Sequence, residues 1–534
     1  MLRSFVFLLA LASLFAAEKY DLVVYGGTAG GVITAVSGAR EGLRVAVLEP
    51  RNHLGGMVSG GLGWTDFGKK EVIGGYSLEF FFRVGRRYNI RQFGHEASWN
   101  FEPQVAEAVF RELAKEAGVT VLYGHRLREK TGVRKVGSRV VEIAMENGAS
   151  FEAKVFADAT YEGDLMAQSG VAYTWGREGV RQYGESLAGV RGETPKHQFL
   201  VDIPAREGGK LLSEIYAGPY GEPEAADKKV QAYNFRMCFS NEPSNRVPFP
   251  KPNGYTSARY ELLARLLEVS TAKNGRPPRI NEVMKPDPIP NRKLDVNNNG
   301  AFSTDYIGGS WDYPEANYVR REQIWQAHLD YVAGFFYFLA NDPRVPAALQ
   351  QEVSEWGLAK DEFTDTNHWP HQLYVREARR MVGDFVMTQK DLQTELSKPD
   401  PIGMGSYNSD SHNIQRVVTK EGFVRNEGDM QVPVTPYQIP YRIMVPRRAE
   451  AQNLLVPVCF SASHVAYSSV RMEPQYMILG HAAGVAAKMA IAGDKAVQDI
   501  DTRALTARLK AQGAVTEYVP SAFQTNWNLF RRVR

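Results

Sequence analysis

The chain has 534 residues, 44% of them hydrophobic and 23% charged, so it can build a packed core and is longer than one typical domain. Lys and Arg number 63 and Asp and Glu number 60, which leaves a net charge of +3 at pH 7. This balance offers no charge excess for a phosphate backbone, so nucleic acid is not an expected partner. Two domains are the default expectation.

The N-terminus has the layout of a secretory signal peptide. A basic residue, Arg3, precedes an apolar run over residues 5–15, and the small residues Ala16 and Ala17 follow. The run is too short to span a bilayer comfortably, and no later stretch has a transmembrane pattern. We therefore expect a signal peptide over residues 1–17 and a mature protein that is secreted or periplasmic, with no stable membrane insertion.

Metal chemistry and serine hydrolysis have little support in the sequence. The only cysteines are Cys238 and Cys459, too few for an iron–sulfur cluster, and they form either one disulfide or two buried thiols. There is no HExxH string, and the ten histidines are scattered, so no metal site is expected. A GxSxG nucleophile elbow is also absent.

A strand, a glycine turn, a helix and a second strand follow the leader. We expect a buried strand over residues 20–25, a GGTAGG turn over 26–31, a helix to about residue 40, and a strand over 44–48 that ends at Glu49. This is the order of a Rossmann dinucleotide site: Gly26 permits the tight turn, Gly31 lets the helix approach the sheet, and the helix N-terminus faces the pyrophosphate. Glu49 lies where a carboxylate accepts hydrogen bonds from the ribose. Thr28 replaces the middle glycine of the pattern.

A second glycine segment, PRNHLGGMVSGG over residues 50–61, follows Glu49 directly. Nicotinamide-binding domains do not need such a segment. With GLGWTD at residues 61–66, the chain here resembles the FAD-dependent oxidoreductase family, and the resemblance implies a bound FAD.

The resemblance continues along the chain. Pro103 opens an expected helix that stops at Gly118, and a strand over residues 119–123 follows. Residues 155–164 look like a second cofactor segment, in which Asp164 either approaches the cofactor or caps a helix. Near the C-terminus, residues 475–490 form an expected helix rich in small residues. Its N-terminus, near Arg471, either faces the flavin pyrimidine edge or belongs to a tightly packed core helix.

These segments together predict the cofactor-binding residues. They are Gly26, Gly27, Thr28, Ala29, Gly30, Gly31, Glu49, Pro50, Arg51, Gly55, Gly56, Met57, Asp158, Ala159, Thr160, Asp164, Arg471 and Gln475.

The middle of the chain differs in composition from its ends. Prolines, tyrosines and tryptophans become frequent from about residue 178 to 446. We predict an α/β fold in which a Rossmann-like FAD-binding domain is split in sequence, over residues 18–177 and 447–534. An inserted mixed α+β substrate domain occupies residues 178–446.

Three stretches of the chain, together with His464, are candidates for binding the substrate or transferring a proton. The aromatic and acidic loop over residues 302–314 suits a carbohydrate-like ligand or is an ordered loop held by its own aromatics. The polar run over 402–413 contains Tyr407 and His412, and His464 lies just ahead of the C-terminal helix; each is a candidate catalytic base. The segment around Arg376 has a helical pattern. Its arginines either form ion pairs on the helix surface or reach an anionic substrate.

The sequence thus indicates a secreted FAD-dependent oxidoreductase. We expect it to transfer hydride from an alcohol or sugar-type carbon of a small organic substrate, with a carbohydrate as the candidate, to flavin N5. Two alternatives remain open: a flavin-dependent lyase or isomerase reaction without net redox, and a secreted carbohydrate-binding protein without catalysis. The electron acceptor is not indicated.

Overall fold

The computed structural model describes residues 17–91 and 96–519, so almost all of the predicted signal peptide lies outside the described residues. The first sheet contains the strands predicted at residues 20–25, 44–48 and 119–123. Its strands run β3-β2-β1-β6-β5-β4, with β22 added against β6. The pairs β1–β2, β1–β6, β2–β3 and β22–β6 are parallel, whereas β5 pairs antiparallel with β4 and β6. The strand bounds are β1 Glu18–Tyr25, β2 Val45–Glu49, β3 Thr120–Tyr123, β4 Val133–Val136, β5 Arg139–Ala144, β6 Ser150–Asp158 and β22 Leu454–Leu455.

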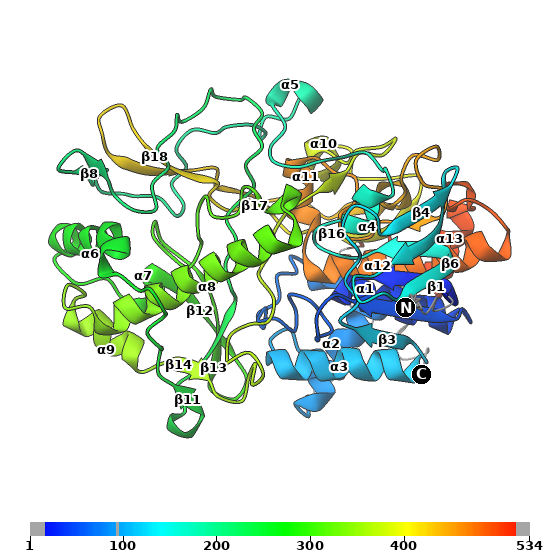
Figure 1. Cartoon of the computed structure of the whole chain (residues 1–534), viewed down its shortest axis with the longest axis horizontal. Helices are drawn as coiled ribbons and strands as arrows, with labels where there is room; N and C mark the ends of the chain where they lie inside the picture. Colours follow the sequence, from blue (N-terminus) through cyan, green and yellow to red (C-terminus); the bar gives the residue numbers. More distant parts are fainter. Residues whose placement is uncertain (1–16, 92–95, 520–534) are drawn as a thin grey trace, which may run out of the picture.

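Two helices distant in sequence pack closely beside this sheet (Figure 1). They are α1 (Ala29–Arg40) and α12 (Glu473–Ala492). A Cβ at Gly480 would lie 2.3 Å from the carbonyl oxygen of Gly30, and the Ser37 hydroxyl donates to the His481 carbonyl at 2.8 Å. Small residues therefore set the helix spacing, as the C-terminal pattern predicted.

A second sheet lies in the other half of the molecule, on the left of Figure 1. It has the order β11-β14-β10-β13-β12, and every pair is antiparallel. The long helix α8 (Tyr318–Asn341) lies in the same half of the molecule. Several aromatic residues near its C-terminal end are buried. The strands are β10 Met237–Ser240, β11 Arg246–Val247, β12 Met284–Ile289, β13 Lys293–Asn298 and β14 Gly357–Ala359.

Shorter elements complete the fold. The other helices are α2 Gly75–Arg87, α3 Pro103–Glu116, α4 Asp164–Gln168, α5 Val180–Tyr183, α6 Glu261–Asn274, α7 Ile280–Val283, α9 Ala347–Ser354, α10 Gln389–Gln393, α11 His464–Val470 and α13 Thr502–Ala511. Two-stranded sheets pair β7 Tyr173–Thr174 with β15 Arg380–Met381, β8 Arg206–Glu207 with β9 Lys210–Leu211, β16 Pro401–Gly405 with β21 Tyr437–Pro440, β17 Ser409–Ser411 with β20 Met430–Val432, and β18 Gln415–Val418 with β19 Val424–Glu427. Across the ranges 17–91 and 96–519, no helix is both long and apolar enough to cross a bilayer.

The predicted division into domains stays a prediction. The second sheet lies wholly within residues 178–446, whereas β22 and α12 from the C-terminal part join the first sheet and α1. The boundaries at 177/178 and 446/447 are not tested by the strand order.

Two sequence interpretations are settled by the structure. The helix expected around Arg376 is wrong: residues 375–379 are not helical, and Arg380 begins the short strand β15. Arg376 and Arg380 are 1% and 0% exposed, because buried carboxylates replace the solvent that a helix surface would offer. Cys238 and Cys459 are both buried free thiols.

Candidate functional site

The predicted cofactor segments surround a cavity of about 620 Å³. Many of its lining residues come from the turn after β1, the segment after β2 and the turn after β6. The cofactor candidates that line it are Gly26, Thr28, Glu49, Pro50, Arg51, Thr160 and Asp164. Residues from α8, including Arg321 and Trp325, also line it.

The glycine turn has the geometry that a dinucleotide requires. Gly26 has φ of +100°, and a Cβ there would lie 2.9 Å from the backbone of Ala159. A Cβ at Gly31 would lie 2.0 Å from the Gly26 carbonyl oxygen, so only glycine lets α1 begin this close to the sheet. Thr28 is the N-cap of α1: its Oγ1 accepts from the Gly31 N–H at 3.1 Å and donates to the Ala159 carbonyl at 2.7 Å. This explains a threonine where the usual pattern has glycine.

Glu49 lies at the end of β2 with its carboxylate at the cavity wall. One oxygen accepts from the Gly27 N–H and the other from the Arg51 N–H, both at 2.7 Å. Burial raises the pKa of this carboxyl to about 7. The backbone thus fixes a carboxylate at the position expected for the ribose hydroxyls of a dinucleotide.

The segment after β6 divides into a structural part and a cavity-lining part. The fully buried Asp158 accepts from the Thr160 N–H and hydroxyl and from the Met166 N–H, so it organises the turn. Asp164 is the first residue of α4, whose N-cap is Gly163, so the helix-cap interpretation of Asp164 is wrong. Its carboxylate instead pairs with Arg321 at 2.6 Å and with Arg379 at 2.7 Å. These two cations hold the pKa of Asp164 below its usual value despite burial.

The other cofactor segments meet at the buried phenol of Tyr161. The Met57 N–H donates to its oxygen at 2.9 Å, and the phenol donates to Glu473 at 2.6 Å. Glu473 begins α12, and burial raises its pKa to about 8. Two residues of the first turn of α12 have a buried polar atom without a hydrogen-bond partner in the described structure, namely Oε2 of Glu473 and Oε1 of Gln475. A ligand with a polar edge, such as a flavin, fits this set.

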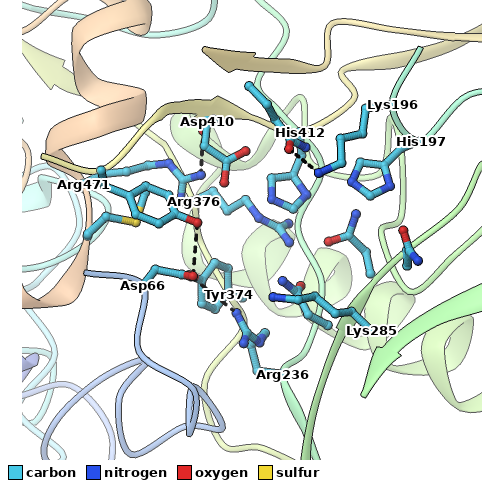
Figure 2. A pocket seen from close by; sticks show the side chains of 16 residues that line it. Asp66, Lys196, His197, Arg236, Lys285, Tyr374, Arg376, Asp410, His412 and Arg471 are labelled. Atoms are coloured by element: carbon cyan, nitrogen blue, oxygen red, sulfur yellow. Dashed lines mark hydrogen bonds and ion pairs between the residues drawn. The ribbon is translucent and has the colours of Figure 1, made fainter. Parts of the chain in front are cut away.

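A second cavity of about 400 Å³ contains the predicted catalytic run (Figure 2). Its walls come from the segment after GLGW, from β12 and β13, from β17 and β20, and from the residues just before α12. The lining residues are Asp66, Lys196, His197, Arg236, Lys285, Asn297, Asn298, Asn299, Tyr374, Arg376, Tyr407, Asp410, His412, Gln431, Arg471 and Met472. The cavity therefore brings polar side chains that can bind a substrate next to the residues that precede α12.

His412 and Asp305 form a buried pair at this cavity. Nδ1 of His412 lies 2.7 Å from Oδ2 of Asp305. The charge of Arg376 and the hydrogen bond from His412 hold the pKa of Asp305 below its usual value despite burial, so the carboxylate accepts and Nδ1 carries the proton. Burial, and then Arg376, lower the pKa of His412. A neutral imidazole with a free Nε2 lone pair results, which is the form that a general base needs.

The other two candidates for the base differ from His412. The Tyr407 hydroxyl donates to Asp66 at 3.1 Å, and burial raises its pKa well above the usual range, which favours the protonated phenol over a phenolate base. His464 begins α11 away from the cavity lining, with Nδ1 2.8 Å from Glu377. Of the two histidine candidates, His412 is the one that lines the cavity.

Several residues that line the second cavity or contact its lining were not singled out from the sequence. Asp305 belongs to the loop over 302–314, but that loop is held by its own aromatics, for example Trp311 donating to the Ile414 carbonyl at 2.9 Å. No residue of this loop lines the second cavity, so it offers no stacking surface there. His197 and Arg236 are single residues in unremarkable contexts, and no local signal marked them.

Comparison with known proteins gives the family. The model of the FAD dependent oxidoreductase family matches residues 21–509. No curated protein matches. Solved structures with similarity include L-proline dehydrogenase from P. horikoshii (18% identity, 31% of this chain and 59% of that chain, TM-score 0.23), the anhydrotetracycline hydroxylase OxyS from Streptomyces rimosus (16%, 34% and 36%, 0.22) and THI4 from Thermovibrio ammonificans (20%, 30% and 66%, 0.22). The chain thus covers less than two thirds of the length of each. Because the family model spans most of the sequence, the chain belongs to the FAD dependent oxidoreductase family and is a flavoenzyme that binds FAD.

Proposed function

We propose that the protein oxidises an alcohol carbon of a small polar substrate held in the cavity of about 400 Å³. The observation that carries this proposal is the His412–Asp305 pair, a neutral imidazole oriented by a buried carboxylate. The same cavity is lined by Arg471 and Met472, which directly precede α12, so the base lies on a wall shared with a cofactor segment.

Bound FAD supplies the acceptor for the hydride that leaves the substrate carbon. Nε2 of His412 takes the hydroxyl proton as the carbonyl forms, and Asp305 stabilises the resulting imidazolium through the Nδ1 hydrogen bond. The Tyr407 hydroxyl stays protonated and is held by Asp66, so it orients polar groups of the substrate. Two electrons and one proton thus leave with the hydride, and the second proton goes to the imidazole.

We further propose export and a saccharide or related polyol as substrate. Support for export is the basic and apolar leader; support for a polyol is the density of carboxylate, amide and cationic groups around the cavity. Mass spectrometry of the protein from the culture medium or periplasm is expected to find a chain that begins near residue 18. A full-length chain confined to the cytoplasm would contradict export.

The first experiment is an anaerobic titration of the purified holoenzyme with sugars, polyols and hydroxy acids. A flavin absorbance that bleaches with one class and stays bleached supports alcohol oxidation. Bleaching that reverses by itself, with no acceptor present, would replace the proposal by a lyase or isomerase reaction. No bleaching with any alcohol would refute it.

A further inference from the structure

Three buried arginines converge on the second cavity from distant parts of the chain (Figure 2). Arg236, Arg376 and Arg471 are 2%, 1% and 3% exposed. The guanidinium carbons of Arg236 and Arg376 lie 5.5 and 4.9 Å from the centre of the Tyr374 ring. We call these three residues the arginine trio.

The trio is only partly neutralised by the protein. Arg236 makes two hydrogen bonds to Asp295, at 2.8 and 2.5 Å. Nη2 of Arg376 lies 3.0 Å from Asp305, a carboxylate that it shares with His412. Arg471 forms no ion pair with any carboxylate of the described residues; its Nη2 donates to the Asp410 backbone carbonyl at 2.8 Å. Among the described residues, the Arg471 guanidinium is therefore buried with no carboxylate in direct contact, although the nearby Asp410 charge favours its charged form.

Unsatisfied donors accompany this charge. Nε of Arg471 and Nε of Arg376 are buried without a hydrogen-bond acceptor. Burial lowers the pKa of Arg376, and the charges of Arg471 and Arg236 lower it further, so both guanidinium groups repel that of Arg376. Buried cations are costly unless an anion pairs with them, and guanidinium groups suit a planar oxyanion.

We propose that the arginine trio receives a carboxylate of the substrate, which narrows the sugar-related substrate proposed above to a polyhydroxy acid such as an aldonic acid. This inference rests on the alcohol oxidation proposed above. A carboxylate is favoured over a doubly charged phosphate because Asp66 and Asp410 also line the cavity and repel excess negative charge. Both carboxylates instead suit substrate hydroxyls, and Oδ1 of Asp410 has no partner within the described part of the chain. A cavity of about 400 Å³ is the size for one such molecule.

The test compares two ligands that differ in one group: an aldonic acid and the alditol of the same carbon skeleton. Binding to the holoenzyme is measured by calorimetry, and flavin bleaching is followed anaerobically. We expect the wild type to prefer the acid by about 30-fold or more, the effect of one buried charge pair. Arg471→Met is expected to abolish this preference, and Arg471→Lys to keep part of it. Removing Arg471 strands no carboxylate, so the variant is expected to fold.

The control is Arg425→Met, which removes an arginine that pairs with Asp202 outside the cavity and is expected to keep the preference. FAD content, measured by absorbance, separates an effect on the substrate from one on the cofactor. If Arg471→Met loses FAD, the same comparison is made with Arg376→Lys, which is expected to weaken the preference.

Each outcome has a distinct meaning. Equal binding of acid and alditol, or a preference that survives in both arginine variants, overturns the carboxylate site even if alditols bleach the flavin. Calorimetric binding of the acid without bleaching by any alcohol keeps the site and refutes alcohol oxidation. Tighter binding of a phosphate monoester than of the acid overturns the choice of carboxylate.

Discussion

Replacing His412 by glutamine tests the proposed base most directly. Glutamine keeps a polar side chain at the cavity but cannot accept a proton. Asp305 keeps its ion pair with Arg376 at 3.0 Å, so no buried carboxylate is stranded and the fold is expected to persist. Loss of a general base lowers the rate by about 10²- to 10⁴-fold, or roughly 3–5 kcal/mol of barrier. We expect flavin reduction to slow by this factor at saturating substrate.

The assay is stopped-flow reduction of the bound flavin under anaerobic conditions, from pH 5 to 9. Because the pKa of His412 is lowered, its neutral form persists below pH 6.5, and the wild-type rate is expected to fall only as pH drops through that lowered value. In His412→Gln this acidic limb disappears. The matched variant Tyr407→Phe removes one hydrogen bond and is expected to cost no more than about 10-fold. A His412→Gln enzyme that reduces its flavin at the wild-type rate refutes the assignment.

Three further predictions follow from the cofactor region and the helix packing. Glu49→Ala is expected to weaken FAD binding by about 10-fold or more, since hydrogen bonds to a charged group are lost; equilibrium dialysis checks this, and unchanged affinity contradicts the ribose role. Folding raises the pKa of Glu473 from 4.5 to about 8, so its contribution to stability is present below pH 4.5 and lost as pH rises through 8. Glu473→Gln is therefore expected to raise the unfolding temperature at pH 9 more than at pH 6, and an equal shift at both would argue against this. Gly480→Ala places a Cβ 2.3 Å from a carbonyl oxygen and is expected to cost about 1–3 kcal/mol in denaturant unfolding, whereas Gly192→Ala, with no atom within 4 Å of its Cβ, is expected to cost little.

The cofactor half was predictable because its signals are local. A turn glycine, a strand end and an acid lie within thirty residues, and each has a single steric or electrostatic reason. Even the exception at Thr28 has a local explanation, the N-cap, although sequence alone left open how close the backbone comes to the pyrophosphate.

The substrate cavity was only partly predictable because its residues come from separate segments. His412 was a candidate base because of the polar residues around it, but its partner Asp305 is 107 residues away in the sequence. Nothing in the local sequence distinguishes His412 from His464 as a base. The prediction that Arg376 lies on a helix was wrong because its neighbouring residues have high helix propensity, whereas buried ion pairs stabilise a non-helical backbone there. Contacts of this kind are properties of the tertiary structure.

The close packing of α1 against α12 has a consequence for the order of events during synthesis. Ser37 bonds to His481, 444 positions later, and β22 joins the first sheet only after 453 residues have been made. The phosphate-binding turn therefore stays without its packing partner until the last eighth of the chain emerges. Nascent chains truncated before α12 should bind no FAD. With the export proposed above, this delay would keep the cofactor site unassembled until translocation is nearly complete.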